Sequence, residues 1–184
     1  MKNMFEFVID NDVVLKLLDT IHANQLSELT DSCRPYLREW LPWVDGSKGI
    51  EDTKAFIEMT KTQFVSNNGF QAGIWYQGSI AGVVGFHEMN WSNKSASIGY
   101  WLGAEFQGKG VMTKACKALV DYAFGELKLN RVEIRCGEGN SRSRAIPERL
   151  GFTKEGIIRD AEWLYDHYVD DVVYGVLSRE WLSE

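Results

Sequence analysis

Two glycines stand at the start of an amphipathic segment in residues 107–114, whose sequence is QGKGVMTK. Glycine lets the backbone come close to a ligand without a Cβ in the way, and the free N–H groups of a helix N-terminus attract anions. An apolar, strand-like segment, Ser97–Leu102, precedes this glycine loop. The order of strand, glycine loop and helix predicts a site for a phosphorylated ligand.

Two nucleotide-binding motifs, the P-loop and the Rossmann fingerprint, are alternative interpretations of the glycine loop. Residues 103–109 fit the first seven positions of a P-loop, but Gly110 stands where a serine or threonine would hold Mg²⁺. The next strand-like segment, residues 132–136, lacks the aspartate of a Walker-B strand. A Rossmann fingerprint would need a third glycine at Thr113. The pattern therefore favours a loop that binds a diphosphate through its backbone, without a metal.

Positive charge gathers around the glycine loop. Residues 107–149 carry nine Lys and Arg against five Asp and Glu, whereas the whole chain has a net charge of −6. Net negative charge argues against a general affinity for nucleic acid. The positive block is either uneven surface decoration or the surroundings of a polyphosphate ligand, and its coincidence with the glycine loop favours the ligand.

Length and composition bound the remaining possibilities. With 184 residues, 45% hydrophobic and 12% aromatic, the chain is long enough to bury a core as one domain spanning residues 1–184. No apolar run resembles a membrane span or a signal-peptide core, so we expect a cytoplasmic protein without a membrane partner. Cys33, Cys116 and Cys136 match no zinc or CxxC spacing, which predicts reduced structural thiols.

Alternating sequence patterns predict strands and helices on both sides of the glycine loop. Before it, the turn-forming residues 10–12 separate two short strands or interrupt one bulged strand. The strands expected there are Phe5–Ile9, Val13–Leu18, Gln71–Tyr76, Ile80–Phe86 and Ser95–Leu102, and the helices are Asp19–Ser32, Arg34–Leu41 and Glu51–Phe64. The elements expected after the loop are a helix at Val111–Leu127, a strand at Arg131–Cys136, a helix at Asn140–Leu150 and strands at Lys154–Tyr165 and Tyr168–Leu177.

The short helix at residues 140–150 has a clear start, a clear end and one irregularity. Asn140 is its expected N-cap, and Gly151 follows its last turn. Pro147 has no N–H group, so the carbonyl oxygen of Ser143 loses its usual helical partner. This helix is therefore expected to bend.

Three motifs in a fixed order carry a resemblance to a known family. They are GYWL at residues 99–102, QGKGVM at 107–112 and NSRSRAIPERLGF at 140–152. With them the chain resembles the GNAT superfamily of acyl-coenzyme A N-acyltransferases over nearly its whole length. The segment LREWLPW at residues 37–43 is similar to the ribosomal-protein N-terminal (serine/alanine) acetyltransferase branch. Met112 replaces the small residue of the family pattern, and we interpret it as a mark of that branch.

This resemblance implies a fold and an acetyl donor. The fold is α/β, with a mixed, mostly antiparallel central sheet of about seven strands, splayed at the cofactor site and flanked by helices. The donor is acetyl-CoA, with its diphosphate on the backbone of residues 107–112 and with Lys109 or Lys114 as candidates for the remaining phosphate. The coenzyme contacts implied are Tyr100, Trp101, Leu102, Gln107, Gly108, Lys109, Gly110, Val111, Met112, Asn140 and Ser143.

The resemblance also implies how the acetyl group reaches an amine. Direct attack requires a neutral amine and a hydrogen-bond donor for the departing thiolate. Ser143 maps to the residue that serves the thiolate, although it could equally be an ordinary first-turn residue. Glu162 maps to the general base, and its alternative is an exposed strand glutamate. Trp40 and Trp43 are expected either to wall the acceptor pocket or to pack in the core.

Three functions remain open from the sequence. The first is acetylation of the N-terminal amine of a ribosomal or similar protein, and the second is acetylation of a small amine such as a polyamine, an aminoglycoside or an amino-acid analogue. The third is a non-catalytic acyl-CoA binding module, against which the presence of Ser143 and Glu162 weighs. The resemblance further implies a homodimer, and the net negative charge predicts no direct nucleic-acid partner.

Overall fold

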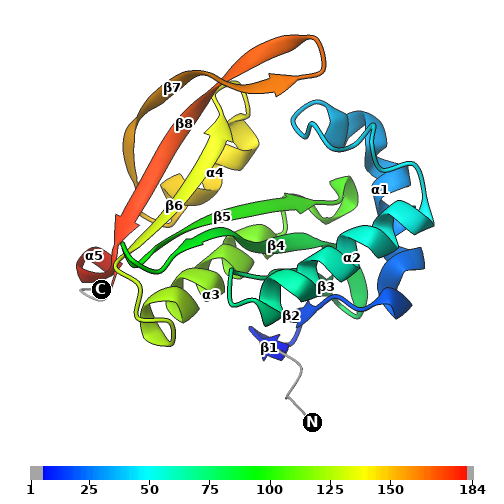
Figure 1. Ribbon diagram of the computed structural model, residues 1–184, viewed down its shortest axis with the longest axis horizontal. Coiled ribbons are helices and arrows are strands. Elements are labelled where there is room, and N and C mark those ends of the chain that lie inside the picture. Colours follow the sequence, from blue (N-terminus) through cyan, green and yellow to red (C-terminus); the bar gives the residue numbers. More distant parts are fainter. Residues whose placement is uncertain (1–5, 182–184) are drawn as a thin grey trace.

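The computed structural model describes residues 6–181, which form one eight-stranded sheet with helices on both faces (Figure 1). Its first half contains β1 (Glu6–Val8), β2 (Val13–Leu17), α1 (Ala23–Arg38), α2 (Ile50–Val65), β3 (Gln71–Tyr76), β4 (Ser79–Asn90) and β5 (Ser95–Leu102). Its second half contains α3 (Val111–Gly125), β6 (Arg131–Gly137), α4 (Ser141–Arg149), β7 (Thr153–Leu164), β8 (His167–Leu177) and α5 (Ser178–Trp181). Short 3-10 turns at Thr20–His22 and Ala104–Phe106 precede α1 and the glycine loop.

The strand order is β1-β2-β3-β4-β5-β6-β8-β7, and every neighbouring pair is antiparallel except β5 and β6. The mixed, mostly antiparallel sheet expected from the resemblance is thus confirmed, with eight strands in place of about seven. Residues 6–17 form two strands joined by a turn, because the Asp10 carboxylate accepts hydrogen bonds from the N–H groups of Asp12 and Val13. Phe5, at the start of the first expected strand, lies outside the described residues.

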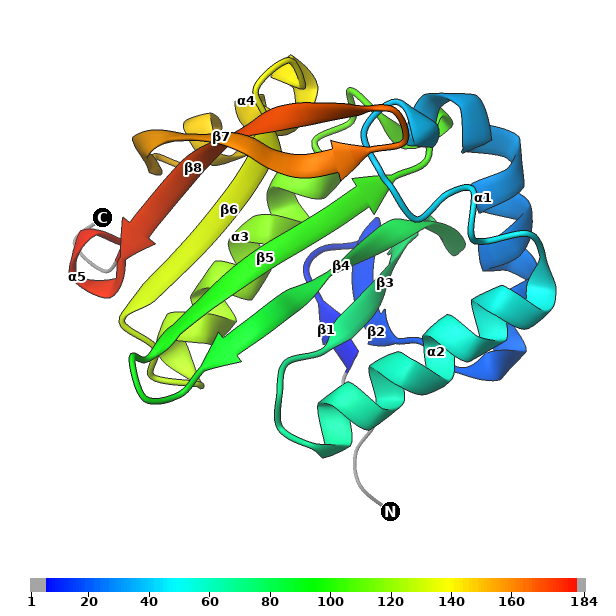
Figure 2. The ribbon, with the colours of Figure 1, turned by 45° about the horizontal axis from the view of Figure 1, so that its top comes forward.

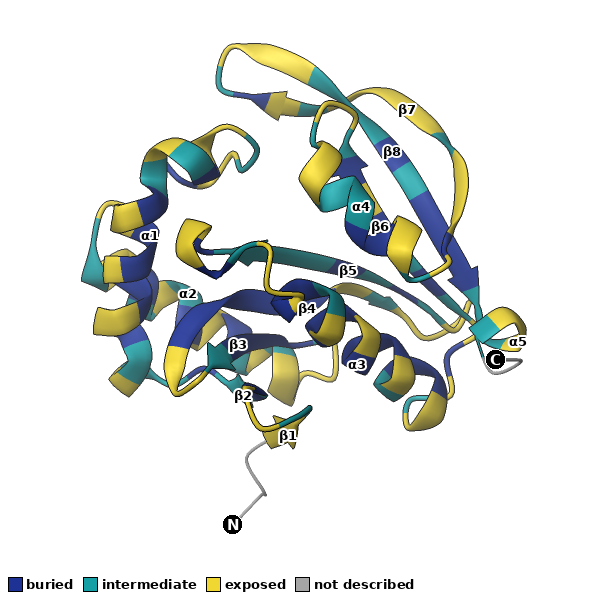
Figure 3. Ribbon diagram, turned by 180° about the vertical axis from the view of Figure 1, so that it is seen from behind, coloured by how far each residue is buried: buried dark blue, intermediate teal, exposed yellow. Residues whose placement is uncertain are grey.

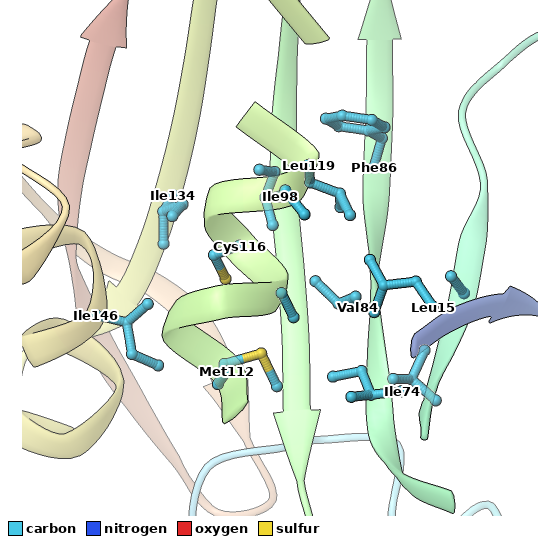
Figure 4. Close-up of a cluster of buried hydrophobic side chains, with 14 of the residues drawn as sticks. Leu15, Ile74, Val84, Phe86, Ile98, Met112, Cys116, Leu119, Ile134 and Ile146 are labelled. Atoms are coloured by element: carbon cyan, nitrogen blue, oxygen red, sulfur yellow. The ribbon is translucent and has the colours of Figure 1, made fainter. Parts of the chain in front are cut away.

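The core lies on both sides of the sheet. Figure 3 shows α3 and α4 together on one face, with the buried side of α3 turned toward the strands, while α1 and α2 cover the other face. Met112, Cys116 and Leu119 of α3 point into the same apolar cluster as Val84 and Ile98 of the sheet (Figure 4). The helical periodicity that predicted α3 therefore corresponds to its buried stripe.

One predicted helix is wrong. Residues 34–38 continue α1 instead of forming a separate helix at Arg34–Leu41, and the chain from residue 39 to 49 is irregular. The buried stripe of α1 continues through Cys33 to Leu37, so apolar burial carries the helix past Pro35. Arg34 also ties the irregular segment back to α1 by donating to the carbonyl oxygens of Val44 at 2.6 Å and Ser47 at 2.7 Å.

The β7–β8 hairpin reaches across the sheet to the end of α1 (Figure 2). The Tyr165 hydroxyl donates to the carbonyl oxygen of Leu41 at 2.6 Å, and the Arg38 guanidinium lies 3.9 Å from the centre of the Tyr165 ring. These contacts join the tip of the hairpin to the C-terminal end of α1 and to the segment that follows it. Among the described residues, no helix is long and apolar enough to cross a membrane.

Candidate active site

The glycine loop leaves its backbone open at the N-terminus of α3. Gly108 and Gly110 have φ angles of +72° and +73°, a left-handed conformation that favours glycine. A Cβ built on either residue would meet no atom within 4 Å, so open space faces both glycines. Gly110 is the N-cap of α3 and makes no side-chain cap hydrogen bond, which leaves the first N–H groups of the helix without helical acceptors. This geometry fits an anion bound by backbone.

The parallel strands β5 and β6 separate where the resemblance predicts a splay. Their pairing runs from Ser95 and Arg131 only as far as Ile98 and Ile134. The outer pairings continue further, β4 with β5 to Leu102 and β6 with β8 to Gly137. Figure 1 shows β6 and β8 rising away from β5. Residues 99–102 therefore expose a strand edge to which an amide-rich arm can add.

A groove of about 1070 Å³ joins the glycine loop to this splay. Most of the predicted coenzyme residues line it, namely Tyr100, Trp101, Leu102, Gln107, Gly108, Gly110, Val111, Met112, Asn140 and Ser143. Within the described residues, the Nε2 atom of Gln107 is a buried donor without a hydrogen-bond partner. An unpaired buried donor is costly, and a polar ligand in the groove would relieve that cost.

The cations around the groove differ from those expected. Lys109 does not line it, because its ammonium lies over the rings of Tyr76 and Phe106, at 5.3 and 5.7 Å from their centres. Lys114 lines the groove but forms an ion pair with Asp10 at 2.7 Å.

Sequence reasoning missed two arginines of α4 that line the same groove. Arg142 donates to Oε1 of Gln107 at 3.0 Å, and Arg149 donates to Oγ1 of Thr113 at 2.8 Å. The two arginines stand seven residues apart and therefore share one helix face, a spacing that was visible in the sequence.

Ser143 stands at the splay, in the first turn of α4. The predicted cap is confirmed, since Oδ1 of Asn140 accepts from the N–H of Ser143 at 3.1 Å. The Ser143 hydroxyl lies 3.2 Å from the Cys136 sulfur and 3.3 Å from the Tyr100 hydroxyl. Burial raises the pKa of Cys136, so this thiol stays protonated near neutral pH. All three described cysteines are free and buried, and Cys136 additionally contacts a candidate catalytic group.

Glu162 lies in a second cavity of about 540 Å³ that also reaches Ser143 and Asn140. A bulge in β7 between Ile158 and Glu162 breaks the pairing with β8 next to this glutamate. Asp171 of β8 lines the same cavity. We call this space the carboxylate pocket.

The carboxylates of this pocket differ in how they are compensated. Glu133 binds Arg131 at 2.7 Å and Arg135 at 2.6 Å. In the part of the chain that the structure describes, neither Glu162 nor Asp171 has an ion-pair partner. Burial, followed by repulsion from Asp171, raises the pKa of Glu162 above its ordinary value. Raised carboxyl pKa values in a cavity are typical of functional acids and bases.

The two tryptophans do not share one wall. Trp40 lines both the groove and the carboxylate pocket, and its ring lies against residues 137–139, where a Cβ added to Gly139 would meet it at 3.0 Å. Trp43 instead lines a third cavity of about 750 Å³ on the α2 side of the sheet, with its ring 5.9 Å from that of Trp101. This apolar cavity also contains Leu26, Phe56, Met59 and Val83. All three cavities meet at Tyr100 and Leu41.

Fold and site together define an N-acetyltransferase whose donor groove opens between two splayed strands. The acetyltransferase (GNAT) domain matches residues 13–153, and the chain belongs to this family.

Three individual proteins are similar to this chain over most of its length. The protein YdaF of Bacillus subtilis (strain 168) is 38% identical over 182 residues, which cover 98% of this chain and 100% of that protein. RimL, the ribosomal L7/L12 alpha-N-protein acetyltransferase solved in complex with coenzyme A, matches with a TM-score of 0.91 at 28% identity, over 94% of this chain and 98% of that one. MccE, the microcin C7 self immunity acetyltransferase solved with acetyl-CoA and AMP, matches with a TM-score of 0.88 at 32% identity, over 92% and 94%.

Proposed function

We propose that this enzyme transfers the acetyl group of acetyl-CoA to a primary amine, and that the amine is the N-terminal α-amino group of a ribosomal protein. The observation that carries the proposal is the position of Ser143, which lines both the groove and the carboxylate pocket. A thioester in the groove and an amine in the pocket would therefore meet at the β5–β6 splay. The match to RimL, in complex with coenzyme A, supports both the donor and the class of acceptor.

The groove offers each part of the donor a chemically matched surface. Backbone N–H groups at residues 107–112 suit the diphosphate, and the dipole of α3 adds to the attraction. The free edge at residues 99–102 suits the amide-rich pantetheine arm. Arg142, Arg149 and Lys114 surround the groove with positive charge for the remaining phosphate.

On the other side of the splay, the two carboxylates without an ion-pair partner in the described part of the chain prepare the amine. The arriving ammonium is attracted by Glu162 and Asp171 and transfers one proton to Glu162, directly or through water. The nitrogen lone pair then attacks the thioester carbon, so that the C–N bond forms and the C–S bond breaks with its electron pair on sulfur. The Ser143 hydroxyl donates a hydrogen bond to this thiolate. The sulfur takes the second amine proton, and the first is released from Glu162 to solvent.

A small amine is a second candidate acceptor, favoured by the apolar cavity around Trp43. This cavity meets the carboxylate pocket at Tyr100, so one molecule with an amine and an apolar or planar group could occupy both. The match to MccE, solved with acetyl-CoA and AMP, supports this alternative. A non-catalytic acyl-CoA binding module is disfavoured, because it would not need two half-buried carboxylates without an ion-pair partner, within residues 6–181, next to the splay.

Isotope-labelled acetyl-CoA distinguishes these functions. The enzyme is incubated with it and either ribosomal proteins or a metabolite extract, and mass spectrometry locates the label. Enzyme-free reactions subtract spontaneous acetylation. We expect label on the N-terminal residue of one or a few ribosomal proteins. Label in small molecules alone contradicts the protein acceptor, and coenzyme binding without turnover on any amine contradicts catalysis altogether.

A further inference from the structure

The first turn of α4 lacks a backbone hydrogen bond that every regular helix makes. In a helix the carbonyl oxygen of Ser143 would accept from the N–H of residue 147, but residue 147 is proline and has no N–H. An unpaired carbonyl in a partly buried position is unfavourable. The structure supplies a replacement donor from another element, since the Tyr100 hydroxyl donates to the Ser143 carbonyl oxygen at 3.0 Å.

Tyr100 is placed so that this bond matters for the site. It lies on β5 beyond Ile98, the last β5 residue paired with β6, and it lines all three cavities. Its hydroxyl also accepts from the Ser143 hydroxyl at 3.3 Å. One phenol therefore contacts both the backbone and the side chain of Ser143 across the splay.

Hydrogen bonds link Tyr100, Ser143 and Cys136 in one cluster. The Tyr100 hydroxyl lies closer to the Ser143 carbonyl oxygen, at 3.0 Å, than to the Cys136 sulfur, at 3.8 Å, and burial holds the pKa of this phenol well above its usual range, so the donor persists at physiological pH. The Ser143 proton can point to the Tyr100 oxygen or to the Cys136 sulfur. Because the Ser143 hydroxyl has two alternative acceptors, and the thiol sulfur is a weak one, its proton stays available for a stronger acceptor such as a thiolate.

We propose that Tyr100 is a positioning residue that acts through Ser143: its hydroxyl replaces the N–H that Pro147 removes and tethers the first turn of α4 across the splay. This tether holds the Ser143 hydroxyl where the sulfur leaves. The inference rests on the proposed function for the role of Ser143. Tyr100 transfers no proton to the substrate, and no bond other than hydrogen bonds changes at its oxygen.

Five variants test the tether by kinetics: Tyr100→Phe, Ser143→Ala, Pro147→Ala, and Tyr100→Phe combined with each of the other two. At saturating acetyl-CoA, Ser143→Ala should lower kcat about 100-fold, as loss of a donor to a developing anion does. Tyr100→Phe should lower kcat about tenfold through one lost hydrogen bond, with little change in the KM for acetyl-CoA. Because Tyr100 acts through Ser143, adding Tyr100→Phe to Ser143→Ala should change kcat by less than about twofold.

The proline variant supplies a rescue that a general packing role would not give. Alanine at position 147 restores an N–H group for the Ser143 carbonyl. The double variant of Tyr100→Phe with Pro147→Ala should therefore have a kcat at least about threefold higher than Tyr100→Phe alone. The single variant Pro147→Ala shows what the proline change does by itself. Full multiplication of the Tyr100→Phe and Ser143→Ala effects overturns the inference. A kcat of Tyr100→Phe equal to that of wild type also overturns it. So does a double variant of Tyr100→Phe with Pro147→Ala that is no faster than Tyr100→Phe.

Hydrogen exchange tests the same tether without an acceptor. Amides at residues 141–146 should exchange several-fold faster in Tyr100→Phe, up to about tenfold, but not in Ser143→Ala, which keeps the carbonyl bond. Equal exchange in wild type and Tyr100→Phe contradicts the tether even if the enzyme is active. A wild-type protein that acetylates no amine, with faster exchange in Tyr100→Phe, would instead reject the proposed function and keep the tether.

Discussion

The two sides of the β5–β6 splay differ in whether backbone or side chains form their surface. The donor side, the groove at the start of α3, is made largely of backbone: two left-handed glycines, a helix N-terminus and a free strand edge. The acceptor side, the carboxylate pocket and the apolar cavity, is lined by side chains from many separate segments, namely α1, α2, the strands β3 to β8 and the segment at residues 39–49. Arg142, Arg149 and Lys114 line the first, whereas the second holds Glu162 and Asp171, which have no ion-pair partner among the described residues, beside Arg131 and Arg135, which pair with Glu133.

This difference explains how one fold can keep a donor and change its acceptor. A backbone cradle depends on conformation, which few substitutions alter as long as the glycines remain. A pocket built from separate segments changes with any one of them. RimL, which is named for ribosomal L7/L12, and MccE, which is named for microcin C7 self immunity, both match this chain over more than nine-tenths of its length.

The largest effect is expected on the donor side. Gly110→Asp would place a carboxylate at the proposed diphosphate site and strain a residue whose φ is +73°. The dissociation constant for coenzyme A should rise about 100-fold or more, since like charges in contact cost several kcal/mol. Calorimetric titration measures it. Gly78→Asp is the matched control, because Gly78 has a φ of +84° and lies in the β3–β4 turn, outside the residues that line the groove. Equal affinity in both variants would count against the cradle.

The acceptor side should respond in rate while its coenzyme affinity stays unchanged. Glu162→Gln should lower kcat about 100-fold where the amine arrives protonated, because the base is lost. Above the pKa of the amine the loss should shrink, and the dissociation constant for coenzyme A should stay near that of wild type. A pH series of initial rates measures this. Loss of the folded state, seen by circular dichroism, would indicate that Glu162 has only a structural role.

A smaller effect is expected from the rim of the groove. Arg142→Ala should raise the KM for acetyl-CoA about three- to tenfold, since one charge-assisted contact is removed. The difference should shrink as salt is added, because exposed charges are screened. Arg159→Ala, a change of another exposed arginine on β7, serves as the control. An effect that is independent of salt would mean that Arg142 acts through Gln107 and not on phosphate.

The smallest effect is a displacement along the pH axis. Burial and then Asp171 raise the pKa of Glu162, and the base is active only when ionised, so the rate falls as pH drops through this raised pKa. Asp171→Asn removes the repulsion, so the acid limb of the kcat profile should move to lower pH with its plateau retained. An unmoved limb would show that another group controls the acid side.

The donor side was largely predictable from the sequence, and the acceptor side was not. Local patterns carry the first: glycine spacing, helical periodicity at α3 and the Asn140 cap are all short-range signals that the structure confirms. Arg142 and Arg149 were missed although their spacing places them on one face, because both seemed ordinary members of a polar helix.

On the acceptor side, long-range contacts decide the arrangement. The segment at residues 39–49 was expected to begin as a helix, but Arg34 and Tyr165 hold it in an irregular path. That path separates Trp40 from Trp43, which were expected either to wall one acceptor pocket or to pack in the core. Asp171 and Glu162 line the same cavity because β7 pairs with β8 and carries a bulge there, and no residue spacing in the sequence predicts this proximity.

A crystal structure of the enzyme with coenzyme A tests the central claim most directly, namely that donor and acceptor meet at the β5–β6 splay. The diphosphate should lie on the amides of residues 107–112, and the sulfur should lie within hydrogen-bonding distance of the Ser143 hydroxyl, facing the carboxylate pocket. A diphosphate bound elsewhere, or a sulfur on the far side of β5 from Glu162, would contradict the account.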